Sequence, residues 1–460
     1  MTSNLIGINR SNLEYFLLVG IVIATTLALT ISCADFAYAA IAAVGAGAPT
    51  VKDQHLKVQV YAQGLVSPTS MAFLDNNHIL VLQKTDGTVH LISNGLLQQQ
   101  PVLKVSVNNK NERGLLGIAV LKNSTSDGTN KHALNAANTG GPATQNTPSK
   151  ASVFLYYTET SSTGKLLGNR VYKYEWNGQA LVNPSLILDL PAKPGTNHQG
   201  GKMLIGPDHF LYAVIGELQR NGQLQNIKDG QPPDDSGVIL RVNPDDGSPA
   251  PNNPFTTKNA SSNNAAAGES KLSKYYAYGI RNSFGIKFDP LSKKLWDTEN
   301  GEKTYDEINL VNPGFNSGWK KIMGPIARNT SVTTQQLVNF PGSHYSDPVF
   351  SWLKSIGITD IEFLNSSKLG DQYANNIFVG DITSGNLYYF TVNKSRTGLN
   401  FDPTTQHGLS DLVADNANEV LAVTFGTGFG GITDIKTGPD GFLYILSYGN
   451  GIIYRVVPSS

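Results

Sequence analysis

The sequence predicts an all-β protein made of many short strands. The chain has 46 glycines and 23 prolines among 460 residues, and only 15% of its residues are charged. Glycine and proline separate short apolar runs along most of the chain, which is typical of strands joined by tight turns. After residue 50, no stretch has the apolar spacing of a long amphipathic helix.

One hairpin pattern recurs along the chain. An apolar pair, a turn containing Asp, Pro, Gly or Asn, and a second apolar run are found at residues 70–83, 203–216, 286–299, 361–380 and 435–447. A repeated hairpin that cannot bury both faces alone is the signature of a radial or stacked repeat. The pattern favours a β-propeller, and an array of β-sandwiches is the alternative.

The N-terminal strands show the expected size of one repeat. Short apolar runs at 58–61, 68–73, 79–83 and 88–92 are joined by turn residues that include Asp86-Gly87, a strong hairpin signal. Four antiparallel strands in about 35 residues match one propeller blade, so we predict that these four form the first. Strands resume at 153–158 and 170–176.

The N-terminus has the pattern of an export signal. Arg10 precedes an apolar run at 16–31, and Ala37-Tyr38-Ala39 supplies small residues at cleavage-site spacing. Residues 1–39 are therefore predicted to be a signal peptide or, because the run is at the short end for a membrane span, an uncleaved N-terminal anchor. Either alternative predicts a secreted or extracytoplasmic protein.

The remaining chain divides by composition. Residues 40–50 are predicted to be a linker and residues 51–460 the propeller domain. Within that domain, residues 124–150 and 254–274 contain few large apolar residues, which predicts a low-complexity insertion and a long loop. The only cysteine, Cys33, lies in the leader, so the folded part has no disulfide framework. Lysine plus arginine equals aspartate plus glutamate at 35 each, which gives no support to nucleic-acid binding.

The stretch 195–217 carries a polar cluster at the mouth of a predicted hairpin. Asn197-His198-Gln199 runs directly into Gly200-Gly201. The glycines allow a close approach of the backbone and predict that the imidazole is uncovered. On these residues alone, His198 is either a turn residue or a functional one.

The chain resembles the glucose/sorbosone dehydrogenase family over roughly residues 55–457. The segments that carry the resemblance occur in the family's order at residues 112–117 (ERGLLG), 197–208 (NHQGGKMLIGPD), 238–243 (VILRVN), 253–255 (NPF), 278–285 (YGIRNSFG), 295–301 (LWDTENG), 306–310 (DEINL) and 316–319 (NSGW). The resemblance implies a soluble aldose dehydrogenase that uses pyrroloquinoline quinone (PQQ) and calcium. It also implies a six-bladed β-propeller of four-stranded antiparallel blades.

The resemblance implies roles for five side chains. His198 would be the general base that takes the proton from the C1 hydroxyl of an aldose while a hydride passes to the quinone, and imidazole suits this role because its pKa lies near working pH. Arg281 matches a catalytic arginine beside the cofactor, with Asn282 as a second cofactor contact. Glu112 and Asn197 fall where the family places polar groups near the sugar. The alternative for Arg281 is a salt bridge with a loop carboxylate.

The resemblance further implies a calcium site on main-chain oxygens. The matching carbonyls belong to Gly301 and Glu302, and carbonyl oxygens suit this hard cation. The alternative is that Asn300-Gly301 is simply a turn.

Two segments depart from the family pattern. A family lysine is replaced at Thr383-Ser384, and two family arginines are replaced at Gly431 and Thr433. PQQ is a tricarboxylate, and each charge-assisted hydrogen bond that is lost costs roughly 1.5–3 kcal/mol of binding. Cations that are near enough in sequence to replace them are Lys354, Lys436 and Arg455.

Three functions remain open on the sequence. The first is an exported PQQ- and calcium-dependent dehydrogenase that passes electrons from a sugar to an external acceptor. The second is a non-catalytic extracellular propeller that serves as a binding or adhesion module, which the missing cations favour. The third, a propeller hydrolase, needs a central metal-binding cluster, for which the spacing of the available carboxylates (Asp208, Glu217, Asp306, Glu307) gives no argument.

Overall fold

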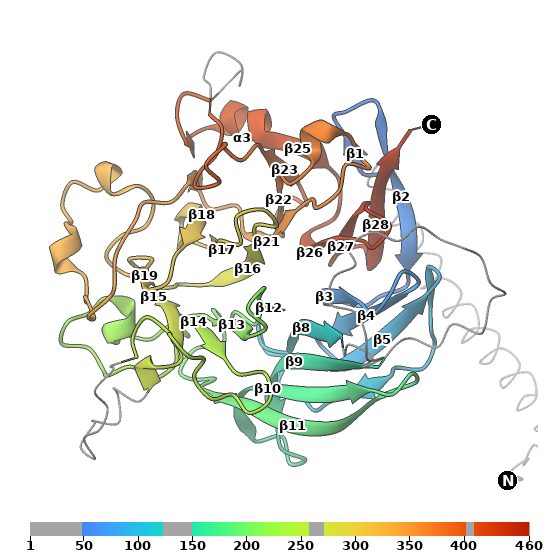
Figure 1. Cartoon of the computed structure of the whole chain (residues 1–460), viewed down its shortest axis with the longest axis horizontal. Coiled ribbons are helices and arrows are strands. Elements are labelled where there is room, and N and C mark those ends of the chain that lie inside the picture. Colours follow the sequence, from blue (N-terminus) through green and yellow to red (C-terminus); the bar gives the residue numbers. More distant parts are fainter. Residues whose placement is uncertain (1–47, 123–149, 257–270, 402–408, 460) are drawn as a thin grey trace, which may run out of the picture. The chain divides into compact units, whose positions relative to one another are not determined.

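The protein is a six-bladed β-propeller (Figure 1). The computed structural model describes residues 48–122, 150–256, 271–401 and 409–459. Six small sheets of four or five strands form the blades. Each blade is built on four antiparallel strands, and four blades add a further short strand. This confirms the predicted propeller and excludes the alternative, an array of β-sandwiches.

Three sequence predictions lie wholly or largely outside the described residues. These are the leader 1–39, the insertion 124–150 and the centre of the loop 254–274. A short strand begins at Thr50, inside the stretch predicted as a linker. None of the helices within the described ranges combines the length and apolarity needed to cross a membrane.

The first three blades follow one another in the chain, apart from one short strand that the third takes from later in the sequence. The first contains β3 (Pro68–Phe73), β4 (His78–Gln83) and β5 (Thr88–Ser93), with β6 (Leu96–Leu97) and β7 (Leu103–Lys104) both paired to β5. The second contains β8 (Leu115–Lys122), β9 (Ala151–Thr160), β10 (Leu166–Trp176) and β11 (Leu181–Leu190). The third contains β12 (Met203–Ile205), β13 (Leu211–Ile215), β14 (Val238–Val242), β15 (Tyr275–Tyr278) and the parallel strand β19 (Phe315–Asn316).

The last three blades borrow strands from elsewhere in the chain. The fourth contains β16 (Ser283–Phe288), β17 (Leu295–Glu299), β18 (Thr304–Val311), β20 (Phe350–Lys354) and the parallel strand β24 (Val413–Ala414). The fifth contains β21 (Ile358–Phe363), β22 (Ile377–Asp381), β23 (Leu387–Phe390), β25 (Thr424–Thr427) and β1 (Thr50–Val51). The sixth contains β26 (Ile432–Thr437), β27 (Leu443–Ser447), β28 (Ile452–Pro458) and β2 (Leu56–Gln63).

Short helical segments lie in the connections between strands. The α-helix α3 (Ala417–Val423) begins at Asn416, whose side chain accepts hydrogen bonds from the backbone N–H groups of Asn418 and Glu419. The 3₁₀ turns are η1 (Gln223–Gln225), η2 (Ile326–Arg328), η3 (Thr334–Gln336) and η4 (Asp371–Tyr373).

The N-terminal strand closes the ring of blades, which corrects the predicted first blade. Strand β2 does not join β3, β4 and β5; it pairs with β28 in the last blade, with Val58 opposite Val456. The run at 58–61 is a strand as predicted, but its partner lies at the other end of the chain. The prediction was wrong because closeness in sequence does not reveal a pairing that joins the two ends of the fold.

The repeated hairpin is the pair of innermost strands in each blade. All five copies found in the sequence coincide with such pairs, from β3–β4 to β26–β27. The sixth copy is β8–β9, whose two strands are separated by residues 123–150. This long separation breaks the short-turn pattern, which is why the sequence showed only five copies.

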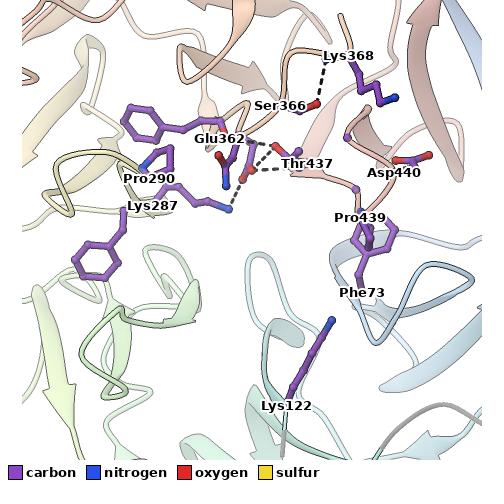
Figure 2. Close-up of a pocket in the computed structure, with 15 residues that line it drawn as sticks. Phe73, Lys122, Lys287, Pro290, Glu362, Ser366, Lys368, Thr437, Pro439 and Asp440 are labelled. Atoms are coloured by element: carbon purple, nitrogen blue, oxygen red, sulfur yellow. Dashed lines mark hydrogen bonds and ion pairs between the residues drawn. The ribbon is translucent and has the colours of Figure 1, made fainter. Parts of the chain in front are cut away.

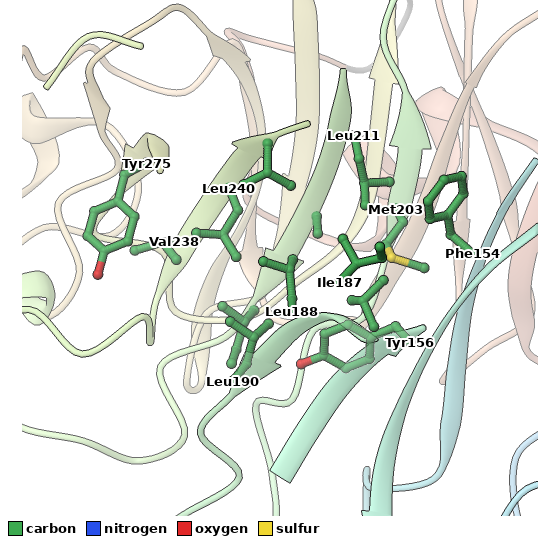
Figure 3. Packing of buried hydrophobic residues seen from close by; sticks show 14 of the residues in the cluster. Phe154, Tyr156, Ile187, Leu188, Leu190, Met203, Leu211, Val238, Leu240 and Tyr275 are labelled. Carbon is green, nitrogen blue, oxygen red and sulfur yellow. The ribbon is translucent and has the colours of Figure 1, made fainter. Parts of the chain in front are cut away.

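The second strands of the blades are largely buried because both of their faces are covered. Strands β13 (LYAVI) and β27 (LYILS) are buried at every position. Neighbouring blades pack face to face, and Figure 3 shows Phe154 and Tyr156 of the second blade among Met203, Leu211 and other side chains of the third. The core is therefore distributed between blades.

Candidate active site

The innermost strands of the six blades all have their N-terminal ends on the same side of the propeller, and the candidate site lies at these ends. Strands β3, β8, β12, β16, β21 and β26 neighbour one another around the centre (Figure 1). Residues at or just before their N-terminal ends line a cavity of about 340 Å³. Its lining includes the charged side chains of Lys84, Glu112 and Lys202 and the apolar side chains of Leu116, Phe284 and Ile382.

Two glycines of the sequence motifs bring the His198 loop against the second blade. A Cβ atom on Gly117 would lie 1.8 Å from the carbonyl oxygen of Gly201, so no larger residue fits on β8 at this point. Gly201 has φ +107° and a Cβ on it would lie 2.7 Å from that of Leu116. Close packing and a positive φ thus explain the glycines that follow His198 and Gln199.

The imidazole of His198 lies between a carboxylate and a guanidinium. Its Nδ1 atom hydrogen-bonds Oε1 of Glu217, which follows β13, and its Nε2 atom lies 2.9 Å from an Nη atom of Arg281. Only 14% of the His198 side chain is exposed, so the prediction of an uncovered imidazole is wrong. His198 also has a φ of +60°, in the left-handed region. This strained, partnered position distinguishes it from an ordinary turn residue.

The two partners define the proton arrangement of His198. An ionised Glu217 only accepts hydrogen bonds, and Arg281 only donates them. Nδ1 therefore carries the proton and donates to Glu217, while the lone pair of Nε2 accepts from Arg281. This tautomer presents Nε2 as a base, with a buried carboxylate on the opposite side of the ring to stabilise the imidazolium that forms when Nε2 is protonated.

Sequence reasoning did not assign this partner role to Glu217. Glu217 is 1% exposed and was considered only as a possible ligand of a hydrolase metal. The sequence signal for this contact is that Glu217 follows the second strand of the hairpin whose first strand follows His198. Because β12 and β13 are antiparallel, the residues before β12 and after β13 lie at the same end of the hairpin.

Arg281 is held by main-chain oxygens. One Nη atom donates to the carbonyls of Asn300 (2.9 Å) and Gly301 (2.8 Å), and the guanidinium lies 5.2 Å from the ring centre of Trp319. Burial lowers the pKa of Arg281 from its ordinary value. Within the described chain its guanidinium forms no ion pair, so the simple salt-bridge alternative is wrong.

Glu112 and Asn282 hold the His198 loop. Oε2 of Glu112 accepts from the backbone N–H groups of His198 (2.6 Å) and Gln199 (3.2 Å) and from the amide of Asn282 (3.2 Å). The amide oxygen of Asn282 accepts from the N–H of Gly200 at 3.3 Å. Both predicted site residues therefore lie together at the motif, and Glu112 also lines the cavity.

The other residues predicted to contact the sugar or calcium, Asn197, Gly301 and Glu302, lie next to His198 and Arg281. Asn197 is half-buried next to His198, and its carbonyl accepts from the side chain of Gln199 at 3.0 Å. Gly301 is buried and Glu302 is exposed. The Asn300 and Gly301 carbonyls both point at the positive charge of Arg281. The Gly301 carbonyl, one of the two predicted calcium ligands, is therefore engaged by Arg281 in this structure, although carbonyl oxygens are donors that suit calcium.

Of the positions where the family carries cations, only Thr433 lines the cavity. The Thr433 hydroxyl donates a hydrogen bond to the carbonyl of Pro68 at 2.9 Å. Thr383 and Ser384 are exposed, and Gly431 has φ +82° in a tight turn.

The replacement cations named from the sequence are wrong, since none of Lys354, Lys436 and Arg455 lines the cavity. Lys436 is committed to buried carboxylates, and Arg455 pairs with Asp440 at 3.1 Å. The two ammonium groups that do line the cavity belong to Lys84 and Lys202. Lys202 stood in the His198 motif, but only the fold reveals that both lysines face the same space.

A buried group of four charges lies beneath the cavity. Nζ of Lys202 lies 2.7 Å from Asp360 and 2.7 Å from Asp434, and Nζ of Lys436 lies 3.0 Å from Asp360 and 2.5 Å from Asp434. Both aspartates are fully buried. Burial raises the pKa of Asp360 to about 6, whereas the two lysines overcome burial and hold the pKa of Asp434 below its usual range.

A second buried acidic group lies behind Arg281. Burial raises the pKa of Glu299 to about 7 and raises those of Asp297 and Glu307 well above their usual values. Glu299 accepts from the backbone N–H of Arg281 at 2.6 Å and from the hydroxyl of Ser317. Glu299 therefore fixes the backbone position of Arg281.

The carboxylates considered for a hydrolase have separate partners. Asp208 pairs with Arg241 at 2.9 Å, and Glu217 hydrogen-bonds His198. Asp306 accepts from the backbone N–H groups of Gly301 and residues 356–358, and Glu307 accepts from that of Gly324. In the part of the chain that the structure describes, no three His, Cys, Asp or Glu side chains are grouped to hold a metal ion.

The structure is a six-bladed propeller in which the imidazole of His198 lies between Glu217 and Arg281, and comparison with known proteins identifies the family. The family model for glucose/sorbosone dehydrogenases matches residues 142–455. The chain therefore belongs to this family, which confirms the resemblance found in the sequence.

Individual relatives are distant. The aldose sugar dehydrogenase of Escherichia coli is 25% identical over 279 residues, which is 60% of this chain and 64% of that protein. An uncharacterised Synechocystis protein is 25% identical over 417 residues, covering 87% of this chain and 86% of the relative. The PQQ-bound aldose sugar dehydrogenase of Streptomyces coelicolor aligns with a TM-score of 0.60 at 22% identity, covering 89% and 99% of the two chains. At that identity the structural likeness establishes the fold alone.

Proposed function

We propose that this chain is a PQQ- and calcium-dependent aldose dehydrogenase in which Nε2 of His198 takes the proton of the C1 hydroxyl. The observation that carries the proposal is the orientation of His198, because Glu217 holds the proton on Nδ1 and leaves Nε2 as the base. Family membership and the names of its relatives support the reaction class.

The residues of this chain supply binding and proton transfer. A substrate hydroxyl that reaches Nε2 replaces the contact with Arg281, and Glu217 stabilises the imidazolium that forms. When bound, PQQ supplies the two-electron sink that accepts the C1 hydride, so that the sugar is oxidised to a lactone. Lys84 is the cavity cation available to a carboxylate of PQQ, because Lys202 is paired with Asp360 and Asp434. The carbonyls of Gly301 and Glu302 are the proposed calcium ligands.

The cofactor proposal is tested by reconstitution. We expect purified protein to bind PQQ in the presence of Ca²⁺ with a saturable absorbance change at micromolar PQQ, and then to reduce an electron-accepting dye with one or more aldoses. Chelation of calcium should abolish both signals. A Lys84→Met variant should weaken PQQ binding by about tenfold, since a charge-assisted contact is lost.

Failure to bind PQQ would contradict the dehydrogenase and favour the second candidate, a non-catalytic binding or adhesion propeller. The specific observation in its favour is the uncharged surface at Thr383, Ser384, Gly431 and Thr433, where the family carries cations. The reconstitution experiment therefore separates the two functions.

We also propose that the protein is exported and passes electrons to an external acceptor. The basis is the order of Arg10, the apolar run 16–31 and Ala37-Tyr38-Ala39. N-terminal sequencing should find a chain that starts after Ala39 outside the cytoplasm, or an intact N-terminus in the membrane fraction if the leader is an anchor. Recovery of the intact chain in the cytosol alone would contradict export.

A further inference from the structure

The channel of the propeller has a second mouth, at the C-terminal ends of the innermost strands. A cavity of about 700 Å³ lies there. Its lining includes the last residues of β3, β8, β16, β21 and β26: Phe73, Lys122, Phe288, Phe363 and Thr437. The candidate active site lies at the opposite ends of the same strands, so the two cavities share no lining residue.

This second cavity has a surplus of positive charge. Three blades contribute Lys122, Lys287 and Lys368 to its lining (Figure 2). Nζ of Lys287 lies 2.5 Å from Glu362, a carboxylate that is 2% exposed and also accepts from Thr437. Within the described residues, the ammonium groups of Lys122 and Lys368 have no hydrogen-bond acceptor or ion-pair partner.

The acidic lining residues do not neutralise those two lysines. Glu362 is paired with Lys287, and Asp440 is paired with Arg455 at 3.1 Å. Two positive charges therefore remain for a ligand. In Figure 2 the side chains of Lys122 and Lys287 extend from different blades toward the same open space.

The uncharged lining suits a hydroxylated ring rather than a bare ion. The half-buried rings of Phe73 and Phe288 provide apolar surface, and the side chains of Asn365 and Ser366 provide hydrogen-bonding groups. A few polar groups set among aromatic walls are typical of a small-molecule site.

The charged group of Lys202, Lys436, Asp360 and Asp434 separates the two cavities. Asp360 is the third residue of β21, and Lys436 is the fifth residue of β26, so both lie inside their strands. Asp360 and Asp434 are fully buried. A ligand in the second cavity therefore has no contact with His198. Its binding does not depend on PQQ or on the proposed reaction.

We propose that the second mouth binds a small anionic sugar, namely a sugar acid or a sugar phosphate. Lys122 and Lys368, on opposite sides of the cavity, supply the positive charge that attracts its carboxylate or phosphate, and the rings of Phe73 and Phe288 cover the apolar face of its ring. Because Lys122 and Lys368 are exposed, this attraction weakens as salt increases.

Calorimetric titration of the full chain with D-glucuronate, glucose 6-phosphate, D-glucose and inorganic phosphate tests the proposal. We expect glucuronate or glucose 6-phosphate to bind more tightly than both D-glucose and inorganic phosphate. The Lys122→Met, Lys368→Met variant should raise the Kd of that anionic sugar by about tenfold or more. The matched control, Lys165→Met, removes an exposed lysine of the β9–β10 turn and should leave the Kd unchanged.

The outcomes of this titration are separable. Glucuronate and glucose 6-phosphate distinguish the two sources of negative charge, and tight binding of either supports the site. The proposal is overturned if neither sugar binds below about 10 mM. It is also overturned if inorganic phosphate binds as tightly as the sugar phosphate, or if the double variant binds as well as the original protein while its unfolding temperature is unchanged.

Discussion

Replacing His198 by alanine is expected to lower dehydrogenase turnover by roughly 10²–10⁴-fold, the usual contribution of a general base. The variant lacks the Nε2 lone pair that takes the C1 hydroxyl proton in the proposed reaction. PQQ binding should persist, since the cavity lysines remain in place. Steady-state dye reduction at saturating aldose measures the effect, and absorbance titration with PQQ verifies that the variant is loaded.

Two further variants show whether the loss comes from the base itself. His209→Ala removes an exposed histidine from the turn between β12 and β13 of the same blade, and its turnover should match the original protein. Glu217→Gln keeps the shape of the partner but removes the carboxylate that stabilises the imidazolium, so its turnover should fall between the other two. Full activity in His198→Ala would exclude His198 as the base.

Replacing Lys202 by methionine should lower the free energy of unfolding by about 3–5 kcal/mol, the usual cost of breaking a buried ion pair. Asp360 and Asp434 are fully buried, and Lys436 alone would then have to balance both carboxylates. The expected loss is a large part of the roughly 5–15 kcal/mol that stabilises a typical domain. Urea unfolding followed by circular dichroism measures it.

A double-mutant cycle identifies the source of that loss. Asp360→Asn alone should also destabilise the fold, whereas the Lys202→Met, Asp360→Asn pair should cost less than the sum of the single changes, because removing both partners leaves less uncompensated charge. The exposed Lys165→Met should change stability by no more than about 0.5 kcal/mol. If the losses of unfolding free energy in the two single variants add up to that of the double variant, the four charges do not act as a group.

Much of the fold was predictable because its unit is local. A blade begins with a hairpin whose strands are close in sequence, so apolar runs and turn residues reveal five of the six copies. The sixth escaped because residues 123–150 separate β8 from β9. The pairing of β2 with β28 escaped for the same physical reason: it joins residues about 400 positions apart, and no local pattern records such a contact.

The sequence by itself determined the repeat, the family motifs and the candidacy of His198, because each depends on residues that are neighbours in the chain. Only the tertiary structure decided which groups meet at the site. It brings Glu217 and Arg281 to opposite sides of the His198 ring. It also places Lys84 and Lys202 in the lining of one cavity. These contacts arise from the closure of six blades around one channel, and closure depends on packing between blades rather than on the pattern within any one of them.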